Sequence, residues 1–79
     1  MLWINEGSES VAKIGVYSVL RQTYFHNEAD AETVRRAFLI EDDEVYVEKI
    51  SNGFGYVRYT NNQGRVTTGW LKMVDLAVW

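Results

Sequence analysis

The chain has 79 residues, with 8 Lys and Arg, 11 Asp and Glu, no cysteine and no proline. This length predicts one compact domain and excludes a multi-step enzyme built from two lobes, and the lack of cysteine excludes a disulfide framework and a thiolate zinc site. The net charge of -3 argues against the clustered positive surface that nucleic-acid binding needs. A hydrophobic fraction of 47% without an apolar stretch of about 18 residues predicts a soluble, folded domain that does not insert into a membrane.

The first residues, MLWINEGSES, mix apolar side chains with small and acidic ones, and we interpret residues 1–10 as an N-terminal arm in front of a domain of residues 11–79. The arm has neither the basic n-region nor the apolar run of a typical secretory signal, and the sequence does not assign the protein to a cellular compartment. Trp3 in the arm and the terminal Trp79 are both apolar, which makes a homodimer as conceivable as a monomer.

The N-terminal half holds one clear strand and one ambiguous segment. The segment VAKIGVYSVL at 11–20 has apolar residues at both odd and even positions, which predicts a strand buried for part of its length. NEADAETVRRAFLI at 27–40 favours a helix by propensity, with acids early and arginines late, yet its second half also alternates as a strand does. We predict a loop with one helical turn near 29–34 and then a strand at about 36–40.

Three later stretches alternate between inward and outward residues: 45–50 (VYVEKI), 54–60 (FGYVRYT) and 65–71 (RVTTGWL). They are joined by turns rich in Asn and Gly, which tolerate a positive φ, and this predicts an antiparallel meander. The last residues, KMVDLAVW, suit one 3₁₀ turn and a final short strand. The fold class is therefore all-β, a small bent antiparallel barrel of about five to six strands with one 3₁₀ turn near the C-terminus.

Candidate catalytic and metal-binding patterns are weak. His26, Glu28 and Asp30 form H-x-E-x-D, but no second histidine is present to complete a typical catalytic zinc site. The acidic run at 41–44 lacks the alternating ligands and central Gly of a calcium-binding loop, and no serine stands in a G-x-S-x-G setting. We predict no catalytic residue, no metal ligand and no cofactor, with a metal-assisted hydrolase at His26, Glu28 and Asp30 kept as an alternative.

Acidic residues are concentrated in one part of the chain. Eight of the eleven lie within residues 28–48, whereas residues 49–79 carry four basic side chains against Asp75 alone. A surface with one acidic and one basic side can steer a charged partner, although ordinary soluble domains carry similar surfaces. One functional alternative is therefore an inhibitor or immunity-type protein that binds a basic toxin or lytic enzyme through this acidic flank.

Aromatic residues exceed what one small core needs, so some are expected at the surface. The set is Tyr24, Phe25, Tyr46, Phe54, Tyr56, Tyr59 and Trp70. Trp70 and Tyr24 are the preferred exposed candidates, and Gly69 leaves space for a ligand or another backbone to approach. Core filling or cross-strand pairing explains any single ring equally well.

Residues 53–76 contain an aromatic-x-x-Val strand, a turn, a Gly-Trp-aliphatic motif and a closing Leu. The positions are Phe54 and Val57, Asn61 to Gly64, Gly69-Trp70-Leu71, and Leu76. In this order they resemble the bacterial SH3-like (SH3b) domain family, with AFLIEDDEVYVEKI similar to its central strands and TYFHNEAD at the place of its RT loop. The resemblance covers about residues 11–76 and implies an SH3-like barrel, but no PxxP ligand, because the eukaryotic proline-peptide groove residues are absent.

The resemblance implies a non-catalytic binding module that recognises a cell-wall peptide, peptidoglycan or an envelope protein, in an extracytoplasmic setting. We place the ligand in a shallow aromatic groove, bordered by an RT-like loop at 22–35 and the loop at 51–53. Its expected lining residues are Tyr24, Phe25, Tyr56 and Trp70, with Arg58 as a carboxylate clamp. Such binding is noncovalent and requires no cofactor.

Overall fold

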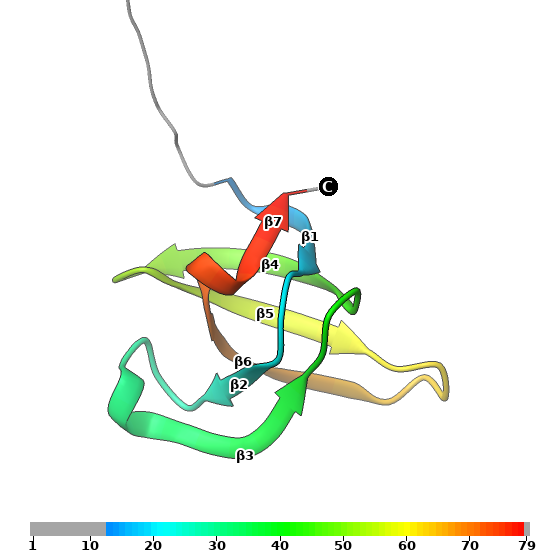
Figure 1. Ribbon diagram of the computed structural model, residues 1–79, viewed down its shortest axis with the longest axis horizontal. Coiled ribbons are helices and arrows are strands. Elements are labelled where there is room, and N and C mark those ends of the chain that lie inside the picture. The colour runs from blue at the N-terminus through cyan, green and yellow to red at the C-terminus, as the bar shows by residue number, and fades with distance from the viewer. Residues whose placement is uncertain (1–12, 79) are drawn as a thin grey trace, which may run out of the picture.

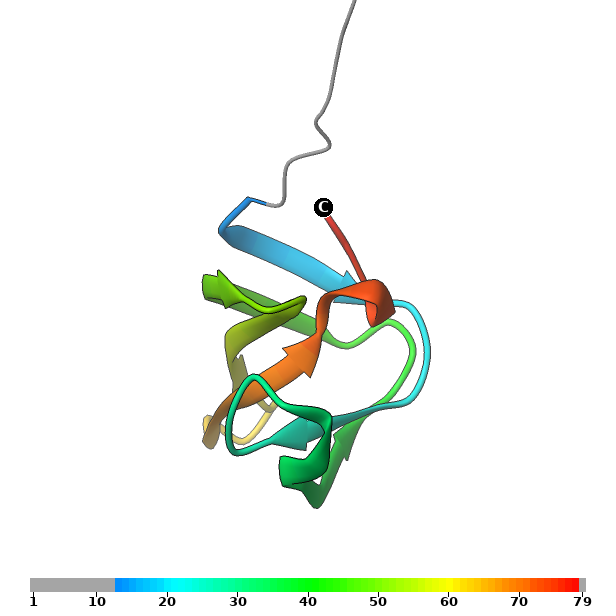
Figure 2. The same cartoon turned by 90° about the vertical axis from the view of Figure 1, so that its left-hand side faces the viewer.

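The computed structural model describes residues 13–78, which form one seven-stranded antiparallel sheet. The strands are β1 (Gly15–Val19), β2 (Thr23–His26), β3 (Val34–Leu39), β4 (Glu44–Ser51), β5 (Phe54–Thr60), β6 (Val66–Lys72) and β7 (Leu76–Val78). Two short 3₁₀ helices, η2 (Ala31–Thr33) and η3 (Met73–Asp75), follow β2 and β6. In the order β3-β2-β6-β5-β4-β1-β7 the sheet curls around its inner face (Figures 1 and 2). The predicted arm of residues 1–10 and Trp79 lie outside the described residues.

The β4–β5–β6 meander has the turns that its sequence predicts. Asn52 and Gly53 have φ values of 56° and 79°, the two successive positive values of a type I′ hairpin, and Ser51 pairs with Phe54 across them. In the β5–β6 turn, the Asn61 side-chain oxygen accepts two backbone N–H bonds. These turns fix the register of the three strands and therefore decide which side chains share a face.

A bulge in β4 changes which residues reach the outer face of the sheet. The register shifts between Val47, which lies opposite Val57, and Lys49, which lies opposite Tyr56. Strict alternation would place Lys49 on the inner face with Val47, but the additional residue turns it outward. Lys49 is accordingly exposed beside Tyr56.

Within residues 13–78 the fold class is all-β, as predicted, with seven strands rather than five or six. The predicted helical turn near 29–34 is the 3₁₀ helix η2, and the predicted 3₁₀ turn near the C-terminus is η3. The ambiguous segment at 27–40 becomes η2 and β3. The Asp30 carboxylate accepts the Glu32 backbone N–H at 2.9 Å and thereby caps η2, while β2 provides β3 with a hydrogen-bonding partner. At the C-terminal end, Leu76–Val78 adds a strand by pairing with β1.

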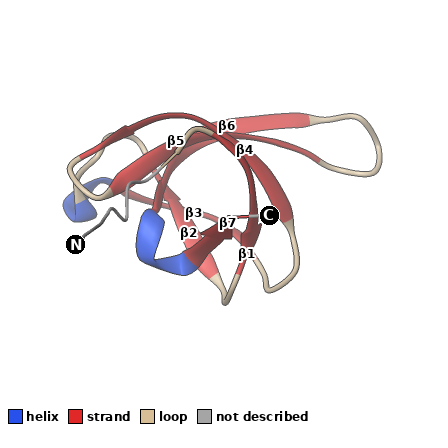
Figure 3. Cartoon of the chain, turned by 90° about the horizontal axis from the view of Figure 1, so that it is seen from above, coloured by secondary structure: helices blue, strands red, loops and turns tan. Residues whose placement is uncertain are grey.

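The hydrophobic core fills the inside of the curled sheet, which is seen from above in Figure 3. Its most buried large side chains are Phe25, Leu71, Val19, Val47 and Val57. Because alternate strand residues point to opposite faces, filling the inside with these residues leaves aromatic and charged side chains on the outer face of β4, β5 and β6. A binding site can form there without disturbing the core.

Candidate ligand-binding site

Lys49, Tyr56 and Trp70 form a cluster on the outer face, which we call the aromatic platform. Tyr56 lies directly opposite both Lys49 on β4 and Trp70 on β6. The two rings meet edge to face with centroids 5.4 Å apart and an interplanar angle of 64°. The Lys49 Nζ atom lies 5.2 Å from the Tyr56 centroid and 5.9 Å from the Trp70 centroid, within cation–π range of both. Both rings are half-buried, so each keeps a surface open to solvent.

Cross-strand pairing is the reason that these three residues meet. Directly opposed side chains on one face of an antiparallel pair have Cβ atoms about 4.5–5.5 Å apart, close enough for rings to touch. Edge-to-face rings are worth about 0.5–1.5 kcal/mol beyond their buried area. Among residues 13–78 the ion pairs are Arg21–Asp75 and Arg58–Glu48, so Lys49 contacts the two rings and no carboxylate. Its charge is available to a ligand.

His26 and Phe54 support the platform from the β2 side. His26 lies opposite Trp70 in the sheet, and its Nδ1 atom is 3.2 Å from the Trp70 carbonyl oxygen. The imidazole packs edge to face on Phe54 with centroids 5.0 Å apart. Both side chains are buried, at 4% and 8% exposure, and the contact of His26 with the Trp70 carbonyl helps to fix the Trp70 backbone.

The alternative of a metal site at His26, Glu28 and Asp30 does not form in the structure. His26 is buried against Phe54, whereas Glu28 and Asp30 lie on the exposed connection to η2, where the Asp30 carboxylate caps the helix. In the described part of the chain, no group of three or more His, Asp or Glu side chains is placed to hold a metal ion.

Phe25 does not line a groove, which corrects the sequence prediction. It is 1% exposed and belongs to the core, with the Arg35 guanidinium carbon 5.3 Å from its ring centroid. Tyr24 and Phe25 are consecutive residues of β2, so their side chains must point to opposite faces of the sheet. Only Tyr24 is therefore exposed.

The space above Gly69 is also occupied by the protein itself. A Cβ atom at this position would collide with the Arg35 guanidinium and lie 3.0 Å from the Phe25 ring. Arg35 is fixed there by its Nη2 atom, which donates to the Thr68 carbonyl at 2.6 Å. Gly69 thus admits an internal side chain and not the ligand that the sequence suggested.

Tyr24 is exposed as predicted but belongs to a different aromatic pair. Its ring lies 5.4 Å from that of Phe38 on β3, and its hydroxyl accepts a hydrogen bond from the Gln22 side chain at 3.2 Å. The Tyr24–Phe38 pair lies on the β2–β3 hairpin, whereas the platform spans β4, β5 and β6. The predicted groove is therefore divided into two separate aromatic pairs.

Arg58 lies next to the platform, two residues beyond Tyr56 on the same face of β5. Its guanidinium donates to the Glu48 carboxylate in an exposed ion pair. Arg58 is therefore already paired with a carboxylate of the chain, whereas Lys49, beside the rings, forms no ion pair in the part of the chain that the structure describes. Lys49 was not among the predicted site residues, because its outward direction depends on the β4 bulge.

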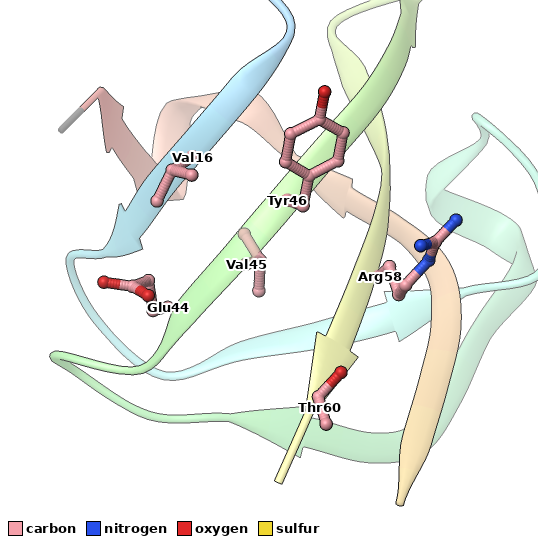
Figure 4. A pocket seen from close by; sticks show the side chains of 6 residues that line it. All are labelled: Val16, Glu44, Val45, Tyr46, Arg58 and Thr60. Carbon is pink, nitrogen blue, oxygen red and sulfur yellow. The ribbon is translucent and has the colours of Figure 1, made fainter. Parts of the chain in front are cut away.

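A shallow pocket of about 190 Å³ continues the outer face beyond Arg58 (Figure 4). It is lined by Val16, Glu44, Val45, Tyr46, Arg58 and Thr60. These residues come from β1, β4 and β5, at the end of the meander away from the platform. Glu44 and Arg58 lie on opposite sides of the pocket, with Tyr46 standing between them.

The acidic residues between 28 and 44 lie at the two ends of β3. Those at 28–32 precede β3 and those at 41–44 follow it, and a strand of this length separates its ends by about 20 Å. Two of the carboxylates also accept local backbone hydrogen bonds, Asp30 from Glu32 and Asp43 from Ile40. The alternative of an inhibitor that acts through one acidic flank gains no support from this arrangement.

Comparisons with protein-family models, with curated proteins and with solved structures gave no match. The resemblance of residues 11–76 to SH3b domains therefore rests on the sequence motifs alone. Within residues 13–78 there is no helix with the length and apolar character needed to cross a bilayer.

Proposed function

We propose that the chain is a non-catalytic binding module of the SH3b type, which recognises a cell-wall peptide, free or within peptidoglycan, through the aromatic platform. One observation carries this proposal: Tyr56 and Trp70 stay partly exposed on the sheet face, and Lys49, which forms no ion pair within residues 13–78, lies over their rings. Two large rings outside the core contribute less to folding than they would inside it, and exposed aromatic side chains next to a free charge are typical of binding surfaces.

The platform has a definite chemical preference. The open surfaces of Tyr56 and Trp70 offer apolar contact to methyl groups, methylene groups or the C–H face of a sugar, and the Lys49 ammonium offers a partner for a carboxylate. Because both rings are held by strand pairing, little conformational entropy is lost when a ligand covers them. The proposed ligand is therefore a peptide with small apolar side chains and a carboxylate close to them.

Sedimentation with purified peptidoglycan tests this function. We expect the wild-type protein to pellet with peptidoglycan and Trp70→Ala to remain in the supernatant. Tyr24→Ala is the matched control, because it removes an exposed ring of the other aromatic pair, and we expect it to pellet like the wild type. A wild-type protein that stays in the supernatant, or a Trp70→Ala variant that pellets equally, contradicts the proposal.

A further inference from the structure

The pocket at the far end of the outer face is lined by one carboxylate, that of Glu44, and one guanidinium, that of Arg58. Among the described residues Arg58 is the one cation that lines it, and Arg58 is paired with Glu48. Glu44 is exposed, and within residues 13–78 its carboxylate has no ion-pair partner. A ligand that carries a cation close to Glu44 would therefore complement the charge of this pocket.

The other lining residues suit the carbon chain that leads to such a cation. Val16 is 41% exposed and Tyr46 is 45% exposed, and they give the pocket an aliphatic wall and an aromatic wall. The Tyr46 ring can also attract a cation through its face, and the Thr60 hydroxyl can accept a hydrogen bond. At about 190 Å³ the pocket is smaller than the ~300–1,000 Å³ clefts that hold drug-sized ligands, so it fits one side-chain-sized group.

We propose that this pocket binds a primary ammonium group on an aliphatic stem, with the ammonium at Glu44 and Tyr46 and the stem against Val16. This inference rests on the proposed function in one respect, because it assigns the pocket and the platform to the same ligand. Glu44 and Lys49 lie on the same face of β4, five residues or about 16 Å apart. The two free charges thus select a zwitterionic peptide of about five extended residues, with its carboxylate at Lys49 and its amine at Glu44.

The pocket can be tested without peptidoglycan. The probe is Nα-acetyl-lysine methylamide, titrated into ¹⁵N-labelled protein, and the acetylated-amine analogue Nα,Nε-diacetyl-lysine methylamide is the control. We expect shifts of the Val16, Tyr46 and Thr60 amides with the first probe only, and loss of those shifts in Glu44→Gln. Glu41→Gln is the matched variant, because it removes one exposed negative charge outside the pocket and should leave the shifts unchanged. Equal shifts with both probes, or no shifts with either, overturn the inference.

Acetylated peptidoglycan separates this inference from the proposed function. If both hold, acetylation of the free amines weakens wild-type binding about two- to fivefold, the range of an exposed ion pair, and the Glu44→Gln variant no longer distinguishes native from acetylated material. If acetylation has no effect while the wild type still pellets, the platform function stands and the ammonium pocket is wrong. If the wild type does not pellet but the lysine probe shifts the pocket amides, the proposed function fails and the pocket remains.

Discussion

The two faces of the β4–β5–β6 meander differ sharply in composition and burial. The inner face presents Val47, Val57 and Leu71, all of which are completely buried. The outer face presents Tyr56 and Trp70, which are half-exposed, together with charged side chains. Burial of apolar surface is the main stabilising contribution to folding, so the inner face accounts for most of the stability of the meander. The outer rings are held in place by the same strands but remain available to a ligand.

If this division is correct, substitutions on the inner face mainly lower the stability of the fold, and substitutions on the outer face mainly weaken ligand binding. Phe25→Ala, Gly69→Ala and Lys49→Gln are expected to lower the free energy of unfolding by progressively smaller amounts.

Phe25→Ala is expected to have the largest effect. Loss of a buried phenylalanine costs about 3–5 kcal/mol, and a domain of this size has a total stability of only about 4–12 kcal/mol. Urea denaturation followed by tryptophan fluorescence measures the change. Tyr24→Ala provides the comparison from the same strand, with an expected loss below about 1.5 kcal/mol because its ring is exposed and packs mainly on Phe38. Equal losses in the free energy of unfolding for the two variants would show that Phe25 is not buried on one face of β2 while Tyr24 is exposed on the other.

Gly69→Ala should have an intermediate effect, of about 1–3 kcal/mol, because the added methyl group pushes Arg35 away and presses on the Phe25 ring. The same denaturation measurement applies. The Arg35→Ala background supplies a double-mutant cycle, in which the cost of Gly69→Ala should fall because the guanidinium that it collides with is gone. An unchanged cost in that background would show that Arg35 does not occupy the space above Gly69.

Several of these features follow from local sequence and others do not. The Asn52-Gly53 turn and the alternation of 45–50 and 54–60 predict the meander correctly, because turn chemistry and side-chain parity both act over a few residues. The direction of Lys49 depends on a bulge, which has no distinctive residue in the sequence. The inward position of Phe25 follows from alternation with Tyr24, but only once residues 23–26 are known to form a strand. That strand depends on pairing with β3 and with β6, and in β6 the partner of His26 is Trp70, 44 residues further along the chain.

Lys49→Gln is expected to have the smallest effect on folding, within about 0.5 kcal/mol, because the side chain is exposed and forms no ion pair in the described part of the chain. It should nevertheless weaken peptidoglycan binding about two- to fivefold, since the ligand carboxylate loses its cation. Binding isotherms from sedimentation measure this effect. Lys49→Arg keeps the charge and should bind nearly as the wild type does. A loss in Lys49→Arg equal to that in Lys49→Gln would mean that the charge is not the recognised feature.

The most direct test of the division between the faces is an amide chemical-shift map of ¹⁵N-labelled protein titrated with soluble peptidoglycan fragments. We expect the largest shifts at Lys49, Tyr56 and Trp70, with further shifts at the pocket residues of β1, β4 and β5 when the fragment carries a free amine. The amides of β3 and of residues 28–32 should not move. Shifts centred on the Tyr24–Phe38 pair or on residues 28–32, with the platform unaffected, would contradict binding at the outer face of the meander.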